Sequence, residues 1–262
     1  MSNRKNWALV TGASGGIGRD IALLLAQRGY DLILVARTED KLQSLALEIQ
    51  TKHQCNTRVI AQDLGVHGSV AQLMNSIGSD VADIEVLVNN AGFGLSGLFA
   101  ETQAHRLSEM VQLNVTSLME LTRAVLPSMQ ARRCGYIMNI ASVVAFQPCP
   151  HFAVYGATKA FVLSMTQALQ VELSGSGVSA TAVCPGSTAT EFHQVAGSDR
   201  SMVAKLMDSS LSVAQDAVKA TLARRSSVVT GLMNKPMPLI NRLVPRMWMA
   251  AGVGRLFRKS RT

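Results

Sequence analysis

The chain has 262 residues, of which 48% are apolar and 16% charged, so it can bury one large core and is not a disordered protein. A net charge of +8 suggests a nucleic-acid binder, but aromatic residues make up only 5% and the central body is not basic, which argues against that class. The sequence enters its first strand directly, so no signal peptide is expected. Four cysteines without Cys-x-x-Cys spacing predict free thiols in a reducing cytoplasm, with neither disulfides nor a zinc site: Cys55, Cys134, Cys149 and Cys184.

The first elements along the chain are a strand, a glycine-rich turn and a helix. Residues 7–10 are apolar, residues 11–18 have the spacing Gly-xxx-Gly-x-Gly, and an apolar-periodic helix is expected over 19–28. Free backbone N–H groups and the helix dipole would together bind a phosphate at such a turn. A tight strand–helix connection without a ligand is the alternative for a glycine-rich turn considered alone.

Further strands and helices alternate along the rest of the chain, which predicts a parallel sheet covered by helices on both faces. The strands are expected at 7–11, 31–36, 57–61, 84–88, 135–140, 178–183 and 226–230, and the longest helices near 101–131 and 152–174. Ligands of such sheets bind in the crevice at the carboxyl ends of the strands. Five polar or turn residues follow strands and are expected to meet there: Gly12, Asp63, Asn90, Ser142 and Pro185.

Tyr155 and Lys159 lie four residues apart, thirteen residues after Ser142. Four residues make about one helical turn, so both side chains project from the same helix face. An ammonium beside a phenol favours the phenolate, which predicts that the pKa of Tyr155 is lowered from ~10 toward neutral pH. Such a tyrosine can pass a proton to or from a reacting oxygen, and Ser142 is placed to hydrogen-bond the same oxygen.

With these motifs in order, the chain resembles the short-chain dehydrogenase/reductase family, and within it the NADP-dependent carbonyl and ketoacyl reductases. Residues 11–18 match the family's cofactor turn, and residues 89–92 match the turn after its fourth strand. Asp63 stands where the family has an adenine-contacting Asp, and Pro185-Gly186 where it has the turn beside the nicotinamide. Ser187-Thr188 replaces the Pro-Val pair of many members, which changes only the expected shape of that loop.

The resemblance implies a doubly wound Rossmann-type α/β fold with a seven-stranded parallel sheet in one domain, residues 1–233. A basic, apolar extension, residues 234–262, is expected to pack on or near the substrate cleft. A homodimer or homotetramer is also implied, paired through the two long helices. The implied cofactor-binding residues are Gly12, Ser14, Gly16, Ile17, Gly18, Arg37, Asp63, Leu64, Asn90, Ala91, Gly92, Tyr155, Lys159, Pro185, Gly186, Thr188 and Thr190.

The implied catalytic set consists of Asn114, Ser142, Tyr155 and Lys159. In the family's chemistry NADPH gives a hydride to a carbonyl carbon, the tyrosine protonates the oxygen, and the serine holds that oxygen. The lysine lowers the tyrosine pKa and binds the nicotinamide ribose, while the asparagine holds a water that leads to solvent. No metal is implied. Oxidation of a secondary alcohol by NAD(P)⁺, or a nucleotide-binding regulatory protein without activity, are the alternatives.

The end of the second strand indicates which nicotinamide cofactor is used. An acid there would bind the ribose hydroxyls of NAD and repel the 2′-phosphate of NADP. The chain has Ala36 at this position, followed by Arg37, whose guanidinium can hold a phosphate. The two residues together favour NADP(H), although a solvated arginine at a helix start is the alternative interpretation.

The substrate is expected to be a hydrophobic ketone, aldehyde or acyl chain rather than a sugar, because the residues around the motifs are mostly apolar. Simple core packing is the alternative for several of them. The candidate pocket residues are Phe93, Leu95, Val143, Val144, His151, Phe152 and Phe192.

The positive charge of the chain is concentrated at its C-terminus, where residues 217–262 contain ten basic side chains and no acidic one. Apolar residues alternate with these charges, and Arg and Pro interrupt the segment too often for a transmembrane span. Weak contact with an anionic membrane surface is one expectation. Covering the substrate cleft, binding an acidic carrier such as an acyl-carrier protein or coenzyme A, and a packed helix with a solvated basic face are the others.

Overall fold

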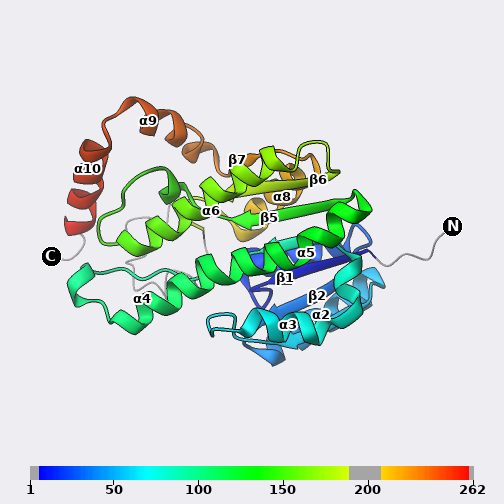
Figure 1. Cartoon of the computed structure of the whole chain (residues 1–262). Coiled ribbons are helices and arrows are strands. Elements are labelled where there is room, and N and C mark those ends of the chain that lie inside the picture. The colour runs from blue at the N-terminus through cyan, green and yellow to red at the C-terminus, as the bar shows by residue number, and fades with distance from the viewer. Residues whose placement is uncertain (1–5, 189–207, 260–262) are drawn as a thin grey trace.

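The computed structural model describes residues 6–188 and 208–259 of the chain (Figure 1). Its strands form one parallel seven-stranded sheet in the order β3-β2-β1-β4-β5-β6-β7. This order confirms the doubly wound Rossmann-type α/β fold, and every expected strand is present to within one residue at each end. The strands are β1 Trp7–Thr11, β2 Asp31–Ala36, β3 Thr57–Ala61, β4 Ile84–Asn89, β5 Gly135–Ile140, β6 Val178–Cys184 and β7 Ser227–Val229.

Helices cover both faces of the sheet, and Figure 1 shows α5 and α6 lying across one of them. Successive residues of a strand face opposite sides, so β1 supplies Val10 to the core under α1, α2 and α8, and Leu9 to the core under α3 and α5. The described helices are α1 Gly16–Ala26, α2 Glu39–His53, α3 Ser69–Ile77, α4 Ala104–Val111, α5 Leu118–Arg132, α6 Ala153–Glu172, α8 Ser210–Leu222, α9 Met237–Leu243 and α10 Arg246–Lys259.

The order of the strands reverses between β1 and β4, because β2 and β3 lie on one side of β1 and the later strands on the other. In open α/β sheets, ligands bind at the carboxyl ends of the strands, at the point where the strand order reverses. The candidate residues that follow β1, β4, β5 and β6 therefore lie at one edge of the sheet.

The expected long helix near 101–131 is not continuous. The 3₁₀-helix Phe99–Glu101 precedes α4, and the π-helix η3, Gln112–Ser117, separates α4 from α5. Single-turn π segments occur frequently at functional sites, and Asn114 lies within this one. The other expected long helix, near 152–174, is α6. The first helix, α1, begins three residues earlier than expected, at Gly16.

The C-terminal segment leaves the sheet after β7 through the 3₁₀-helix η6, Leu232–Asn234, and continues into α9 and α10. Figure 1 shows α9 and α10 as an arm at the same end of the molecule as α4. The arm contacts the body through α9, which lies against the 3₁₀-helix η4, Val143–Phe146, and through α10, where Gly254 lies against Pro150. Among the described residues, the helices are all too short or too polar to cross a lipid bilayer.

Candidate active site

The glycine-rich turn between β1 and α1 requires its glycines. Gly12 and Gly16 have φ values of +65° and +54°, in the left-handed region that favours glycine. A Cβ on Gly18 would lie 2.3 Å from the carbonyl oxygen of Gly12, which no side chain tolerates. The residue before α1 is Gly15, which has no side chain that could cap the helix. The first N–H groups of α1 have no partner within the helix and stand at the crevice, where they can bind an anion.

Asn90 fastens this turn to the turn after β4. Its Nδ2 donates to the carbonyl oxygens of Thr11 and Gly12, at 3.0 and 3.1 Å. Thr11 also joins the two turns, because its Oγ1 accepts hydrogen bonds from the backbone N–H groups of Asn90 and Ala91. Asn90 thus acts on the cofactor turn by holding its backbone in shape. Ser14 and Ile17 lie between the fixed glycines, and Ile17 also packs on the core beneath α1.

The end of β2 presents a free positive charge. Arg37 is exposed, and in the part of the chain that the structure describes no acid pairs with its guanidinium. Ala36 is buried beside it. At the end of β3, Asp63 uses its Oδ1 to accept a hydrogen bond from the N–H of Gly65, at 2.8 Å. Leu64 is buried and anchors this turn, since its carbonyl oxygen accepts a 2.6 Å bond from Ser117.

Ser142 and Tyr155 meet at the ends of β5 and α6. Their side chains share a hydrogen bond, and both residues are buried. The Ser142 Oγ also accepts from the N–H of Val144 at 3.3 Å and donates to the carbonyl oxygen of Pro185 at 3.4 Å. The hydroxyl pair is therefore held by the start of η4 on one side and by the turn after β6 on the other.

The expectation of a lowered tyrosine pKa is wrong for this structure. Burial raises the pKa of Tyr155 above its ordinary value, and the hydrogen bond with Ser142 opposes that rise only in part. Lys159 lies with its Nζ 5.8 Å from the centre of the Tyr155 ring and donates a 2.7 Å hydrogen bond to the carbonyl oxygen of Ile140. Burial also lowers the pKa of Lys159, to about 8. For both Tyr155 and Lys159, the cost of burying a charge outweighs the attraction between a phenolate and an ammonium at this distance.

Asn114 packs beside Lys159 from the π-helix. Its Nδ2 donates to the carbonyl oxygen of Phe93 at 2.9 Å and to the hydroxyl of Thr158 at 3.2 Å, and its Oδ1 accepts from the N–H of Phe93. A Cβ on Gly92 would lie 2.9 Å from the Asn114 Oδ1 and 3.6 Å from the Lys159 Nζ. The turn after β4 therefore passes directly over the lysine because Gly92 has no side chain.

The turn after β6 closes the site on the side of Ser142. The carbonyl oxygen of Pro185 accepts hydrogen bonds from the N–H of Val143 and from Ser142. Gly186 follows, and the buried Thr188 pairs with Asp208 across a parallel bridge. Thr190 and Phe192, also candidate site residues, lie outside the described residues.

Apolar side chains surround Tyr155. Phe152 contacts its ring edge to face, with centroids 6.2 Å apart, and the other members of the cluster are Met110, Cys149, Phe93, Leu95, Leu107, Val144, Val154 and Val253. Four of the expected pocket residues are thus brought together. His151 has a φ of +67° and its carbonyl oxygen accepts from the N–H of Gly97, so its backbone is committed to that loop. Burial raises the pKa of the Cys149 thiol to about 11 and keeps it neutral.

Within the described ranges, no three His, Cys, Asp or Glu side chains are grouped so as to hold a metal ion. The sequence profile of short chain dehydrogenases matches residues 6–201. The chain belongs to the short-chain dehydrogenase/reductase family. The glycine-rich turn, the buried Ser142–Tyr155 pair and Lys159 of this short-chain dehydrogenase all lie inside the matched region.

This short-chain dehydrogenase is 34% identical over 187 residues to an uncharacterized oxidoreductase of Staphylococcus epidermidis, a match that covers 71% of the chain and 80% of that protein. It is 36% identical over 184 residues to a very-long-chain 3-oxoacyl-CoA reductase of Phaeosphaeria nodorum, which covers 67% of the chain and 52% of the reductase. A solved short-chain dehydrogenase from Sphingobium yanoikuyae in complex with NADPH matches with a TM-score of 0.81 at 34% identity, covering 97% of this chain and 95% of that one.

Three residues of this short-chain dehydrogenase belong to the site although the sequence did not single them out. Thr11 joins two turns through its hydroxyl, Thr158 bonds to Asn114 and to the carbonyl oxygen of Tyr155, and Val253 reaches the Tyr155 cluster from α10. The sequence could have indicated two of these residues, because Thr11 directly precedes the first glycine of the turn and Thr158 directly precedes Lys159. Nothing in the sequence around Val253 indicates its contact.

Proposed function

We propose that this short-chain dehydrogenase reduces a carbonyl group of a hydrophobic small molecule with NADPH. The observation that carries the proposal is the buried Ser142–Tyr155 pair, with the pKa of Tyr155 raised by burial. A phenol with a raised pKa is protonated at neutral pH and is ready to give its proton to a carbonyl oxygen. The NADPH complex of the structural neighbour, at 34% identity over almost the whole chain, supports the choice of cofactor.

The residues present fit a bound nicotinamide dinucleotide. The phosphates would meet the first turn of α1, the extra phosphate of NADP would meet Arg37, and Asp63 would lie near the adenine end. The nicotinamide end would lie between Gly92, Lys159 and the turn after β6. Residues assigned to this binding site are Gly12, Ser14, Gly16, Ile17, Gly18, Arg37, Asp63, Leu64, Asn90, Ala91, Gly92, Tyr155, Lys159, Pro185, Gly186, Thr188 and Thr190.

The protein groups act on the substrate oxygen. When bound, NADPH supplies a hydride to the carbonyl carbon. Ser142 donates a hydrogen bond that orients the carbonyl, and Tyr155 delivers the proton to its oxygen. Lys159, as a cation beside the phenol, stabilises the negative charge left on Tyr155, while Asn114 holds the turn that passes over the lysine. A proton from solvent then restores the phenol.

The substrate class follows from the apolar cluster around Tyr155. Phe93, Leu95 and Val144 pack against the cluster that contains Tyr155 and offer contacts to an aliphatic or aromatic chain rather than to a sugar. The reductase of Phaeosphaeria nodorum is named for very-long-chain 3-oxoacyl-CoA, and the match spans about half of its length. A ketone that carries a long apolar group is therefore the substrate class we propose.

A turnover assay tests the function directly. NADPH consumption is measured by absorbance with a series of 3-oxoacyl thioesters and bulky apolar ketones, and with sugars as the comparison. Consumption that increases with the apolar size of the ketone supports the proposal. NADPH binding without turnover of any carbonyl would point to a regulatory protein. Turnover only of secondary alcohols with NADP⁺ would assign the physiological direction to oxidation.

We also propose a homodimer or homotetramer paired through the helices of residues 101–131 and through α6. Its outer face carries Ala157, Phe161, Ala168 and Val171, which recur at helical spacing, and Val171 is 76% exposed. Replacing Phe161 by Glu places a charge in the centre of this face. We expect sedimentation at micromolar concentration to show an oligomer for the wild type and a smaller species for Phe161→Glu. A monomeric wild type would contradict the proposal.

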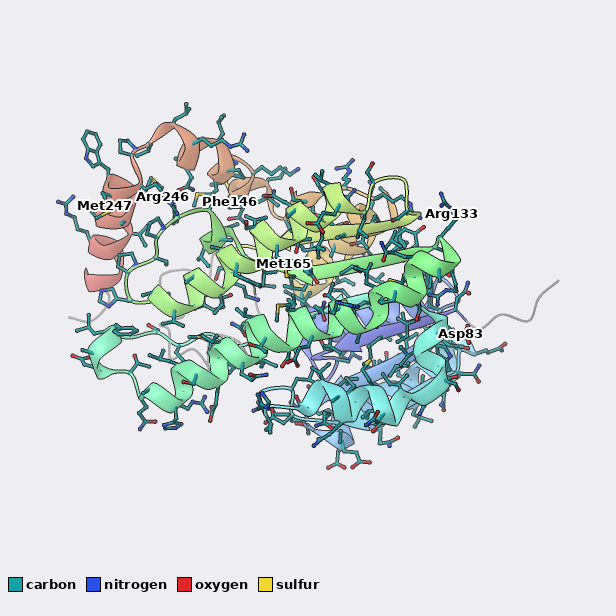
Figure 2. All side chains as sticks on the ribbon, viewed as in Figure 1. Asp83, Arg133, Phe146, Met165, Arg246 and Met247 are labelled. Atoms are coloured by element: carbon teal, nitrogen blue, oxygen red, sulfur yellow. The ribbon has the colours of Figure 1, made fainter. Side chains whose placement is uncertain are left out.

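The C-terminal arm, α9 and α10, supports a further part of the proposal, weak contact of a cytoplasmic protein with an anionic membrane surface. Among the arm's side chains that the structure describes, four large apolar ones are more than half exposed: Leu239, Leu243, Met247 and Trp248. Arg242 and Arg246 lie among them, and Figure 2 shows Arg246 and Met247 on the arm. A second copy of the arm would bring like charges together, because residues 217–262 contain no acid. An anionic lipid surface complements both the charge and the apolar side chains.

Vesicle flotation measures this contact. We expect binding to anionic but not to neutral vesicles, and release at 1 M salt, where the Debye length falls to ~3 Å. Trp248→Ser should weaken binding, whereas Leu47→Ser, which removes another exposed apolar side chain on α2, should not. Equal flotation with both kinds of vesicle, or none with either, would leave the arm as packed structure with a solvated basic face.

A further inference from the structure

Asn234, the last residue of η6, lies behind the turn that leaves β6. Its Nδ2 donates to the carbonyl oxygen of Thr230 at 2.9 Å and to the Oδ2 of Asp208 at 3.4 Å. Thr230 is fully buried, and its N–H donates to the carbonyl oxygen of Cys184, the last residue of β6. The side chain of Asn234 is therefore fixed on the end of the sheet, at the entrance to the C-terminal arm.

The amide of Asn234 is packed flat against Gly186. A Cβ built on Gly186 would lie 2.2 Å from the Nδ2, 2.6 Å from the Cγ and 2.7 Å from the Oδ1 of Asn234. No side chain fits in that space while Asn234 is in place. Gly186 does not need to be glycine for its backbone angles, since its φ is not in the left-handed region. It needs to be glycine because Asn234 is there.

Asp208 links the side-chain amide of Asn234 to residues 187 and 188 of the turn. Its backbone N–H donates to the carbonyl oxygen of Ser187 at 3.1 Å, and it pairs with Thr188 in a parallel bridge. The side chain of Asp208 also requires Gly231, where a Cβ would lie 2.2 Å from its Oδ2. The turn 185–188 is thus held between Asp208 and Asn234, which are separated from it in sequence.

Residues 185–188 also hold the reacting hydroxyl pair, because the carbonyl oxygen of Pro185 accepts hydrogen bonds from the Ser142 Oγ and from the N–H of Val143. We propose that Asn234 is a positioning residue for the nicotinamide end of the cofactor and for Ser142, acting through its contact with Gly186 and its bond to Asp208. Asn234 does not touch the reacting atoms. It sets the position of the turn that does.

The first test replaces Asn234 by Ala and uses Asn241→Ala as the matched control. Asn241 lies in α9 and makes one local bond, from its Nδ2 to the carbonyl oxygen of Met237. We expect the Kd for NADPH, measured by fluorescence titration, to rise about threefold to tenfold in Asn234→Ala, the range for a lost hydrogen-bonded contact. Asn241→Ala should remain within about twofold of the wild type. An unchanged Kd in Asn234→Ala overturns the inference.

The second test is a double-mutant cycle, which distinguishes positioning from a general loss of stability. Gly186→Ala alone should raise the Kd for NADPH by at least about tenfold, because the new methyl group displaces Asn234 or moves the turn. In the Asn234→Ala background the space is free, so adding Gly186→Ala should cost less than threefold. Equal effects of Gly186→Ala in both backgrounds would refute the contact as the cause.

The inference rests on NADPH binding at this turn, which is part of the proposed function. If the wild type does not bind NADPH, the proposed function is wrong, and the role of Asn234 in cofactor binding is wrong with it. If the wild type binds NADPH and Asn234→Ala lowers only the thermal midpoint, with the Kd unchanged, the proposed function stands and Asn234 has a purely structural role.

Discussion

Replacing Tyr155 by Phe is expected to lower kcat for NADPH-dependent carbonyl reduction by at least ~10², because the variant has no proton to give to the substrate oxygen. The ring stays packed against Phe152 and the apolar cluster, so the Kd for NADPH should change little. Steady-state kinetics and a fluorescence titration measure the two quantities separately. Normal turnover in Tyr155→Phe would sink the assignment of the catalytic residues.

Tyr30→Phe is the matched control. Tyr30 also has a half-buried hydroxyl with a side-chain partner, the Oε1 of Glu85 at 3.1 Å, but it lies beside the amino ends of β1 and β4. Removing that hydroxyl should leave kcat unchanged, even where it lowers thermal stability. A comparable loss of kcat in both variants would show that the effect of Tyr155→Phe is a general response to losing a buried hydroxyl.

The pH profile of the wild type follows from the same buried groups. Tyr155 has a raised pKa and keeps its proton across the neutral range, whereas Lys159 has a pKa of about 8 and loses its proton above that pH. The rate of reduction should therefore be constant up to about pH 8 and fall above it. Lys159→Arg should move this fall to higher pH, because a guanidinium remains charged.

Changing Ala36 to Asp together with Arg37 to Ser is expected to reverse the cofactor preference from NADP(H) to NAD(H). The guanidinium of Arg37 is exposed and unpaired among the described residues, so a phosphate meets no competing acid. A charge-assisted bond of this kind contributes about 1.5–3 kcal/mol, or roughly 10- to 100-fold in affinity for NADPH. The introduced carboxylate adds repulsion of the phosphate and binds ribose hydroxyls.

The ratio of kcat/KM for NADPH and NADH measures this preference. Arg28→Ser is the control, because Arg28 is exposed, carries the same charge and lies before the other end of β2, where its guanidinium donates to the carbonyl oxygen of Leu24. It should leave the ratio unchanged. A wild type that uses NADH as well as NADPH would show that Arg37 does not contact the phosphate.

The strands, their parallel arrangement and the position of the cofactor turn could all be predicted from the sequence. Alternating apolar runs and glycine spacing are local properties, and the buried strands must be covered on both faces, so the pattern of residues 7–18 leaves few alternatives. The roles proposed for Tyr155, Lys159 and Arg37 came from spacing, from residue type and from the resemblance to the family. These features depend on residues close to one another in the sequence, and in the structure each of these residues lies on the strand end or helix where the sequence placed it.

The contacts that hold the site, and the direction in which the pKa of Tyr155 is shifted, depend on segments that meet only in the folded chain. The interruption of the long helix at 112–117 accompanies bonds from Asn114 to Phe93 and Thr158, which are distant in sequence. The raised pKa of Tyr155 comes from burial, and burial is a sum over segments that spacing does not report. The packing of Asn234 against Gly186 is of the same kind, because two residues 48 positions apart share a space that only the folded chain creates.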